Sequence, residues 1–578
     1  MASKNRFFFR VSVLLCVFCV FGALLMAASG IVPRARAADL VKVGLLEEPK
    51  TLNVWLGSDA WSRKVLGLIY YPLYVSEPEN LGLTPWLAEG DPVYDEAALT
   101  YTVKLREALW SDGTPFTAED VAFTANVINE FKDSRRYYKW KFVKQVEVVD
   151  PRTVRFHLAE PMAIFLQRTL TTPIIQKKQW LPVVEEARKT EKPLATLRNH
   201  TMDHPVGTGP FMLKEWKQGA YLFMKTNEHF FGKGKTIAGH TLGPHIDGII
   251  FKVFGTSDAA VMALKKGDID MFWWRIQPGY IPELENHEEI KLFTNERSAL
   301  YYMGFNVRKK PFDNAALRRA VAYLIDRNFI MLRVLQGYGT MMTSIVPPGN
   351  TFWHCPDIPE YANSVLLRGE RTRKAYEILS KAGFTWETPP VNDEGEMVPG
   401  KGIRLPDGSP MKDFTILTPP ADYDPARAMA GVMIQEWLRA VGFPASAKPM
   451  AFGSLIDQVK GRHDFDMFVL GYGSLSLDPD YLRSFFHSKN DKPRGWNMSG
   501  YTNPEYDRLA DESARTMDPE GRQKQVFEMQ RILMEDVPYI PLYNPHLIEA
   551  VRTDNFEGWV SMLEGIGNTW SFCNLKAK

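Results

Sequence analysis

Short runs of alternating apolar and polar residues recur along the chain. They lie at residues 41–46, 100–105, 153–158, 247–254, 413–418 and 465–472, and many of their apolar members are β-branched or aromatic. Such runs predict β-strands, because successive side chains of a strand point to opposite faces of a sheet. Helical patterns lie between the runs, so the chain is predicted to be α/β throughout.

Two of the helical patterns are clear enough to predict which residues face inward. In residues 425–443 the predicted apolar face consists of Met429, Val432, Met433, Trp437, Leu438 and Val441, and Gly442 supplies the stop. In residues 312–330, Asp313 is the predicted N-cap, and the predicted inward residues are Leu317, Val321, Leu324 and Ile325. Residues 181–203 and 388–410 have weak patterns and are expected to be loops or small surface excursions.

The stretch WSDGTPFTAEDVAFTANVI, residues 110–128, is dense in local structural signals. Trp110 ends a strand-like run, and Ser111, Asp112 and Gly113 are suited to a turn. Thr117 is a predicted N-cap, and Asp120 stands where a capping box places its acidic partner. Each conspicuous residue has a local structural role, so the stretch is expected to lie outside any binding site.

The N-terminus has the features of a secretory signal peptide. A basic flank with Lys4, Arg6 and Arg10 precedes an apolar run at 11–27, and the small-x-small triplet of residues 35–37 follows. Cleavage before Ala38 is predicted, which makes residues 1–37 the signal peptide and the mature chain a secreted protein. A retained membrane anchor is the alternative. Two cysteines remain after residue 37, Cys355 and Cys573, and either a disulfide or two separate buried thiols is compatible with an oxidising compartment.

Composition narrows the possible partners. The 578 residues exceed the size at which a single core stops growing, and 45% apolar with 24% charged residues is a globular composition. The net charge of +1 provides no field for nucleic-acid binding, so no nucleic-acid partner is expected. Aromatic residues reach 12% and include 15 Trp, which suits either ligand surfaces or large cores.

The chain carries none of the compact catalytic motifs. It has no phosphate-binding loop, no G-x-S-x-G nucleophile elbow and no H-E-x-x-H zinc motif. His200 with His204, and His240 with His245, lack further ligands at suitable spacing. No catalytic residue, metal or cofactor is therefore predicted, and the protein is not expected to be an enzyme.

Eight sequence blocks together resemble a known family. They begin at Leu105, Pro205, Val261, Phe305, Gly337, Asp478, Gly500 and Glu535, and they include LREALWSDGTPFTAEDVAF, PVGTGPFMLKEWKQG and GYTNPEYDRLADE. In this order they closely resemble the extracytoplasmic solute-binding proteins of family 5, the oligopeptide-, dipeptide- and nickel-type receptors of ABC importers. The resemblance covers nearly all of the chain after residue 37.

The resemblance implies a bilobal α/β fold of the large periplasmic-binding-protein class, with a ligand cleft between the lobes. The implied bounds are 38–305 for the first lobe, with an extra subdomain at about 76–204, and 306–536 for the second lobe. Residues 537–578 would return to the first lobe. The two crossovers between lobes are expected near SALYYMGFN and DVPYIPLY.

The implied cleft residues form two groups, and the first group lies near the first crossover. Trp273, Trp274 and Arg275 follow a Gly-Asp-Ile-Asp turn and offer stacking faces and a guanidinium. Because strand neighbours point in opposite directions, one of the two Trp side chains is expected in the pocket and the other in the core. Tyr302 is a further candidate, subject to the same alternation with Tyr301.

The second group follows the strand at 465–472. Many peptide-binding relatives have a Trp and an Asp here, and the Asp pairs with the ammonium of the ligand; this chain has Tyr472 and Leu475 at those positions. Leucine cannot neutralise a buried ammonium, so free-amino peptides are expected to bind poorly. Asp478 matches a second Asp of the family and is expected to cap a turn. Trp496 and Asn497 are further candidate lining residues.

The resemblance implies a periplasmic receptor that captures a peptide-like or other organic solute by hinge closure. Its partners would be the small organic solute or short peptide and the permease subunits of an ABC transporter with their cytoplasmic ATPase, and a monomer is expected. Two alternatives remain, a receptor that signals to a membrane sensor and a secreted hydrolase on the same fold.

Overall fold

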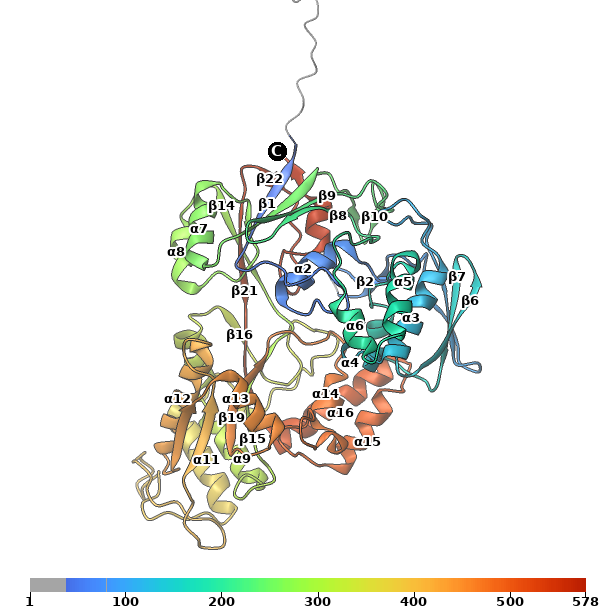
Figure 1. The fold of residues 1–578 in the computed structure, drawn as a ribbon. Helices are drawn as coiled ribbons and strands as arrows, with labels where there is room; N and C mark the ends of the chain where they lie inside the picture. Colours follow the sequence, from blue (N-terminus) through green and yellow to red (C-terminus); the bar gives the residue numbers. More distant parts are fainter. Residues whose placement is uncertain (1–37, 80) are drawn as a thin grey trace, which may run out of the picture. The chain divides into compact units, whose positions relative to one another are not determined.

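The computed structural model describes residues 38–79 and 81–578. The predicted signal peptide, residues 1–37, lies outside the described residues. Residues 41–578 form one compact unit that contains two large β-sheets, each with helices packed against it (Figure 1). This agrees with the predicted α/β class, and all six predicted strand runs coincide with strands.

The first large sheet has seven strands in the order β14-β21-β13-β1-β12-β9-β8. The side chains of β1 alternate as predicted, because Val41, Val43 and Leu45 all point into the core and are fully buried. The strands are β1 (Leu40–Leu45), β8 (Phe211–Lys217), β9 (Tyr221–Thr226), β12 (Gly248–Val253), β13 (Met271–Phe272), β14 (Ile290–Asn295) and β21 (Leu547–Arg552). Its helices are α2 (Ala60–Ile69), α7 (Ser257–Lys266), α8 (Ile281–Glu285) and α17 (Thr569–Asn574).

A four-stranded sheet, in the order β4-β5-β7-β6, occupies the part of the chain where the extra subdomain is expected. Its strands are β4 (Val93–Asp95), β5 (Thr100–Lys104), β6 (Val143–Asp150) and β7 (Thr153–Leu158), and its helices are α3 (Ala118–Phe131), α4 (Ser134–Trp140), α5 (Lys177–Arg188) and α6 (Pro193–Asn199). The loop predicted at 181–203 is therefore wrong in part, since α5 and α6 fill most of it. Trp180 and Val184 are fully buried and anchor α5 despite its charged exposed face.

Helix α3 begins as the stretch 110–128 predicts, at the N-cap Thr117. The carboxylate of Asp120 accepts the Thr117 N–H at 3.0 Å, the indole N–H of Trp110 at 3.2 Å and the Lys177 N–H at 2.8 Å. Burial raises the pKa of Asp120. This one carboxylate joins a turn and the starts of two helices, so the role of the stretch is structural.

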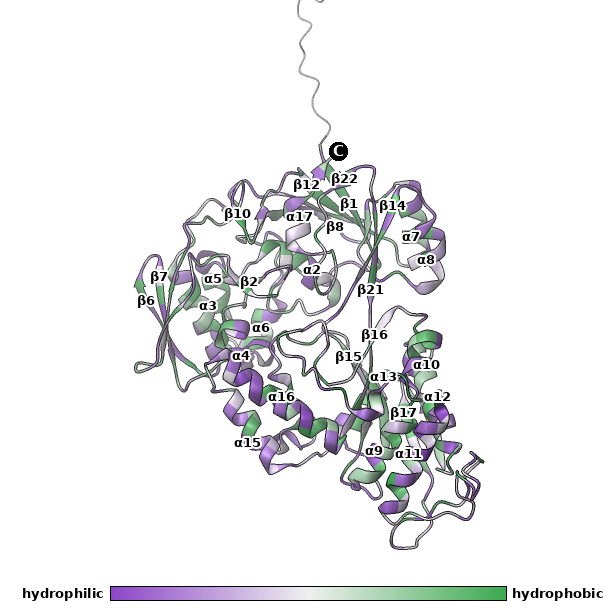
Figure 2. Cartoon of the chain, turned by 180° about the vertical axis from the view of Figure 1, so that it is seen from behind, coloured by the Kyte–Doolittle hydropathy of each residue, from purple (hydrophilic) through white to green (hydrophobic). Residues whose placement is uncertain are grey.

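The second large sheet has the order β16-β20-β15-β19-β17-β18. Its strands are β15 (Leu300–Phe305), β16 (Gly339–Met341), β17 (Phe414–Thr418), β18 (Ala445–Pro449), β19 (Met467–Tyr472) and β20 (Tyr539–Pro545). Its helices include α9 (Ala315–Leu324), α11 (Arg368–Lys381), α12 (Pro425–Arg439), α14 (Tyr481–Phe486), α15 (Pro504–Ser513) and α16 (Pro519–Asp536). Figure 2 shows α15 and α16 banded in hydrophobic and hydrophilic residues, as expected for helices with one buried face.

The chain passes between the two large sheets twice, after Asn295 and again between Pro545 and Leu547. Sheet pairing therefore groups β15 and β20 with the second sheet, although the predicted lobe bounds assign residues up to 305 and from 537 to the first lobe. The lobe bounds themselves stay a prediction.

The predicted face of α12 is wrong in part. Leu438 and Val441 are buried as predicted, and Met433 and Trp437 are half-buried. Met429 and Val432, however, are 49% and 40% exposed, and Arg427, Ala430, Gly431 and Ile434 are buried in addition. The cause is close packing on β17, because a Cβ at Gly431 would lie only 2.3 Å from Thr418 Cγ2. The close approach at Gly431 therefore places the small residues Ala430 and Gly431 on the inner face of this helix, beside Ile434 and Leu438.

Helix α9 has its predicted inward face, and Leu317, Val321, Leu324 and Ile325 are all buried. Its N-cap is Asn314 and not the predicted Asp313: the Asn314 amide oxygen accepts the N–H groups of Ala316 and Leu317 at 2.9 and 3.3 Å. Both residue types cap helices well, so the pattern alone could not separate two adjacent candidates.

The remaining short elements connect the larger ones. They are β2 (Tyr74–Ser76), β3 (Leu83–Pro85), β10 (Thr236–Ile237), β11 (His240–Thr241), β22 (Phe556–Glu557), β23 (Lys576–Ala577), α10 (Arg327–Phe329) and α13 (Phe452–Ile456). Cys355 and Cys573 are separate buried thiols. Within the described residues, no helix combines the length and apolar character needed to cross a bilayer. In the same residues, no three His, Cys, Asp or Glu side chains gather as a metal site requires.

Candidate ligand-binding site

A cavity of about 1050 Å³ lies between two parts of the chain that are far apart in sequence. One wall comes from residues 135–168, around α4 and the end of β7. The other wall comes from residues 472–515, where the second sheet ends in β19 and α14 begins. Its volume is at the upper end of what small-molecule sites occupy, which is enough for a drug-sized or oligopeptide-sized solute.

The second wall is aromatic. Tyr472, at the end of β19, stacks on Phe485 of α14 with ring centroids 4.4 Å apart and planes 10° apart. Trp496 lies 5.9 Å from Phe485 and 6.2 Å from Tyr472, and it remains 47% exposed. We call Tyr472, Phe485 and Trp496 the aromatic wall. Phe485 is buried, whereas Tyr472 and Trp496 are partly exposed, and flat exposed faces of this kind suit apolar or planar parts of a ligand.

The loop after β19 contributes Leu475 to the cavity lining. Residues of the connector between the two sheets bind the backbone of this loop. The Leu475 N–H donates to the Ser298 carbonyl at 2.5 Å, and Arg297 Nη2 donates to the Gly473 carbonyl at 2.5 Å. Ser298 N–H in turn donates to Glu564 Oε1 at 2.8 Å. The connector between the two sheets therefore fixes the backbone of the loop that lines the cavity.

Asp478 and Asp480 follow Leu475 and are both buried. Arg522 donates two hydrogen bonds to Asp478, at 2.6 and 2.9 Å, and Asp478 Oδ1 accepts the Asp480 N–H at 2.9 Å. Burial alone would raise the pKa of Asp478, but the Arg522 guanidinium outweighs it and holds that pKa below its usual value. The predicted turn-capping role of Asp478 is confirmed.

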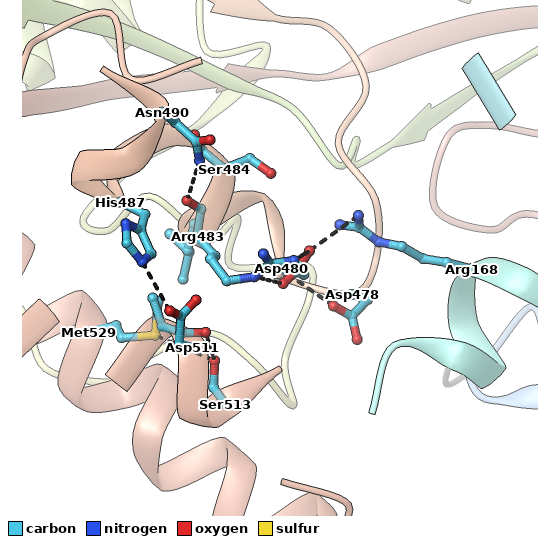
Figure 3. A network of polar contacts seen from close by, with 12 residues as sticks. Arg168, Asp478, Asp480, Arg483, Ser484, His487, Asn490, Asp511, Ser513 and Met529 are labelled. Atoms are coloured by element: carbon cyan, nitrogen blue, oxygen red, sulfur yellow. Dashed lines mark hydrogen bonds and ion pairs between the residues drawn. The ribbon is translucent and has the colours of Figure 1, made fainter. Parts of the chain in front are cut away.

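Asp480 connects the two walls. Its carboxylate receives Arg483 of its own helix at 2.7 and 2.8 Å, and it lies 3.3 Å from Arg168 Nη1 on the opposite wall (Figure 3). Arg168 and Asp480 are 8% and 5% exposed, so water screens this pair little. The two walls of the cavity are therefore in direct electrostatic contact.

Three of the eight predicted site residues lie together at this cavity, namely Tyr472, Leu475 and Trp496. Asn497 is adjacent in sequence but fully buried, and its amide bonds the backbone of Tyr501 at 2.8 Å and of Phe486 and His487 at 3.3 Å. It shapes the loop that carries Trp496. Its predicted contact with a ligand stays a prediction.

The other predicted residues lie away from the cavity lining. Trp273 is 4% exposed and packs on Phe572 and Phe251 in the core of the first sheet. Trp274 is half-buried, and its ring centroid lies 4.7 Å from that of Trp61. Trp273 therefore lies in the core, as predicted for one of the two indoles, and the predicted place of the other indole in the ligand pocket stays a prediction. Arg275 is half-buried.

Tyr302 is fully buried behind the aromatic wall and does not line the cavity. It stacks on Tyr539 at 4.3 Å and on Tyr472 at 5.4 Å, so it supports a lining residue from the core side.

Sequence reasoning missed the wall formed by residues 135–168. The sequence of α4 with its flanking residue, SRRYYKWK, holds four cations and three aromatic residues, and this density was a usable signal. Arg168 had no comparable signal, because nothing in the local pattern shows that it reaches Asp480. Only the tertiary fold brings these positions together.

A second buried charged centre lies where the chain returns to the first sheet. Glu549 of β21 is 1% exposed and its carboxylate accepts the Ile566 N–H at 2.6 Å. Burial raises the pKa of Glu549, and burial lowers the pKa of Lys64, whose Nζ lies 4.1 Å from the Trp273 ring centroid. Each group partly offsets the shift of the other through charge.

The chain thus combines two sheets joined by two crossings with a large cavity lined from separate parts of the chain, an arrangement suited to ligand binding. The family model described as bacterial extracellular solute-binding proteins, family 5, matches residues 82–493. The chain belongs to this family of solute-binding proteins.

Individual relatives agree with this family. The oligopeptide-binding protein AppA of Bacillus subtilis is 28% identical over 532 residues, which cover 91% of this chain and 89% of the relative. The glutathione-binding protein GsiB of Escherichia coli is 27% identical over 91% of this chain and 93% of the relative. The solved structure of Bacillus subtilis AppA with a nonapeptide has a TM-score of 0.67 at 26% identity and covers 93% of this chain and 98% of that one.

The structure of NikZ from Campylobacter jejuni in complex with Ni(L-His) has a TM-score of 0.70 at 24% identity, covering 94% of this chain and 100% of that one. At this identity the likeness supports the fold alone. The expected periplasmic-binding-protein fold is confirmed.

Proposed function

We propose that this protein is a periplasmic receptor that captures a peptide-like or other organic solute and delivers it to the permease of an ABC importer. The observation that carries the proposal is the cavity between residues 135–168 and 472–515, which has an aromatic wall and a loop fixed by the inter-sheet connector. The names of the relatives, an oligopeptide-binding and a glutathione-binding protein, support a peptide-like cargo.

Capture would proceed by closure of the two walls on the solute. The Arg168–Asp480 contact already spans the cavity, so a solute that adds contacts to both walls stabilises the conformer in which they are close. The solute-bound protein then populates the conformer with close walls, and a permease can distinguish this conformer from that of the empty protein.

Leu475 favours solutes other than ordinary free-amino peptides. It is 9% exposed and lines the cavity at the position where many peptide-binding relatives place an ammonium-pairing Asp. A ligand ammonium at that position would be desolvated without a counter-charge, which is costly. The cargo we propose therefore lacks an α-ammonium or keeps it outside the cavity.

The proposal extends to the maturation and assembly of the chain. Residues 1–37 would be removed as a signal peptide, and the receptor would act as a monomer without cofactor, metal or catalytic activity. A purified chain starting at Ala38 should run as a monomer in size-exclusion chromatography with light scattering.

Native mass spectrometry of protein purified without refolding tests the receptor function directly. We expect a bound organic molecule of a few hundred daltons that leaves on collisional activation. Calorimetry with tri- to pentapeptides then tests the role of Leu475, and weak binding is expected. Micromolar or tighter binding that is lost on N-acetylation would contradict the proposal about the ammonium.

A further inference from the structure

The lining of the cavity carries a surplus of positive charge. Six cationic side chains line it, against the three carboxylates of Glu160, Asp480 and Asp511. The cations are Arg135, Lys141, Arg168, Arg483, Lys489 and Arg515. The whole chain has a net charge of only +1, so this surplus of three is a local feature of the cavity.

All three carboxylates of the lining are already paired with cations of the lining. Asp480 holds Arg483 and Arg168, as described above. Lys489 Nζ lies 2.7 Å from Asp511, and Arg515 Nε lies 3.1 Å from Glu160. A cationic solute would have to displace one of these partners, so the cavity offers no free counter-charge to an ammonium.

The cations without a partner in the lining lie on α4, at Arg135, and at its C-cap, Lys141. Arg135, Tyr138 and Lys141 are spaced three residues apart and face the cavity together. The Lys141 amine has no ion-pair partner within the described residues, and Arg135 lies 3.5 Å from Asp133, a carboxylate that it shares with Arg136 and Arg198. Helix α4 therefore presents positive charge that the protein itself does not neutralise.

The neighbouring Lys139 responds to this charge. Burial, together with the nearby guanidinium groups of Arg168 and Arg136, lowers the pKa of Lys139 to about 8. Burial disfavours the charged form of this lysine, and each positive neighbour disfavours it further.

Arg168 adds an independent sign of an unfilled site. Its side chain is nine-tenths buried at the cavity wall, yet Nε has no hydrogen-bond partner in the described part of the chain. A buried guanidinium N–H without an acceptor is costly, and a carboxylate is the acceptor that a guanidinium binds best. Small movements of the wall on binding would let an anionic group supply that acceptor.

We propose that the cavity selects solutes that carry a carboxylate, have a net negative charge and present a flat or apolar part to the aromatic wall. The carboxylate would lie toward α4 and Arg168, opposite Tyr472, Phe485 and Trp496. N-blocked peptide acids fit this description, and free-amino peptide amides do not. This inference rests on the receptor function proposed above and specifies the solute class of the same cavity.

Three matched series of phenylalanyl dipeptides test the selection, with the second residue varied over the natural amino acids. The first series is N-acetylated with a free carboxylate, the second has a free ammonium and a C-terminal amide, and the third is capped at both ends. Binding to the mature chain is measured by calorimetry at low and physiological salt. We expect the acids to bind at least about tenfold more tightly than the amides, with an advantage that shrinks as salt rises.

The outcomes separate this inference from the receptor proposal. If the amides bind as tightly as the acids, or more tightly, the charge selection is wrong and the receptor function stands. If no member of any series binds at 1 mM, a concentration at which sites of ordinary affinity would be filled, the inference about the solute class is contradicted, and the receptor function is decided separately by native mass spectrometry.

A charge variant locates the effect. Lys141→Met removes an exposed cation of the lining with little loss of packing, and we expect it to weaken the acid series about threefold while leaving the doubly capped series unchanged. Lys266→Met, on the exposed side of α7, removes the same charge away from the cavity and is the control. Equal weakening of all three series, or of none, by Lys141→Met would contradict the proposed orientation.

Discussion

At the scale of single residues, one buried ion pair supports a residue of the cavity lining from outside the cavity. Asp478 and Arg522 are both buried and joined by two hydrogen bonds, and Asp478 also fixes the backbone of Asp480. Removing the charge of Asp478 would leave Arg522 buried without a counter-charge, which is a strongly destabilising change.

We therefore predict that Asp478→Asn lowers the free energy of unfolding by about 3 kcal/mol at pH 7. Because the folded-state pKa of Asp478 lies below its usual 3.8, the stabilisation is fully present above 3.8 and is lost as the pH falls through the folded pKa. Urea unfolding at pH 7 and at pH 3 should show a large difference from the wild type at pH 7 and a smaller one at pH 3. Glu505→Gln, in an exposed pair with Arg508, should have no measurable effect; a difference for Asp478→Asn that does not depend on pH would refute the linkage.

Leu475 permits a gain-of-function prediction at the same scale. In Leu475→Asp the new carboxylate would face the cations of the cavity, which favour its charged form and leave it available to an ammonium. Free-amino peptide amides should then bind about tenfold more tightly than to the wild type, as measured by calorimetry. Leu475→Asn has the same shape without the charge and should give no gain; an equal gain in both variants would mean that volume, and not charge, excludes the ammonium.

At the scale of elements, the cavity loop depends on the connector between the sheets. Arg297 binds the Gly473 carbonyl, and Ser298 binds the Leu475 N–H from the same connector. The loop after β19 has few other polar supports, so its order should depend on this connection.

Arg297→Ala should therefore raise the amide exchange rate of the peptide that covers residues 473–477 by about tenfold, the cost of one charge-assisted hydrogen bond. Hydrogen-exchange mass spectrometry measures this change. Arg404→Ala removes an arginine from an exposed pair with Glu387 and should leave that peptide unchanged. If the loop exchanges at the wild-type rate in Arg297→Ala, the connector does not hold it.

Elements were predicted well where local chemistry decides them. The capping box at Thr117 and the alternation of β1 need only neighbouring residues, and both are found where the sequence predicts them. The buried face of α12 was predicted only in part, because the orientation of this helix depends on a close approach to β17 at Gly431, which no local pattern encodes. The lining of the cavity was predicted only in part for the same reason. Tyr472 and Leu475 follow a recognisable motif, whereas Arg168 reaches the cavity only through tertiary contact.

At the scale of the whole molecule, the first sheet is completed by a strand from the far end of the chain. β21 pairs with β14 on one side and β13 on the other, with Phe272 opposite Ala550 and Leu292 opposite the same residue. Without β21 the sheet would lose β14 and expose the apolar partners of Ile548 and Val551.

A chain that ends at His546 keeps β20 but lacks β21, and we expect it to lose the cooperative unfolding of the first sheet. Tryptophan fluorescence in urea measures the change, because Trp55, Trp86 and Trp180 are buried on that side of the molecule. A chain that ends at Leu575 lacks only β23 and should unfold as the full chain does. A sharp, wild-type transition in the shorter chain would show that β21 is dispensable.

The position of β21 also determines the order in which the two large sheets can fold. During synthesis β1 is made early, but its neighbour β13 cannot be flanked on both sides until residues 547–552 have emerged. Pairings this distant in sequence close slowly, because the intervening chain must first be brought together. The second sheet, whose strands all lie within residues 300–545, is free to form before the first. Folding of this protein is thus expected to finish in the first sheet, which contains the early strand β1, only after residues 547–552 have emerged.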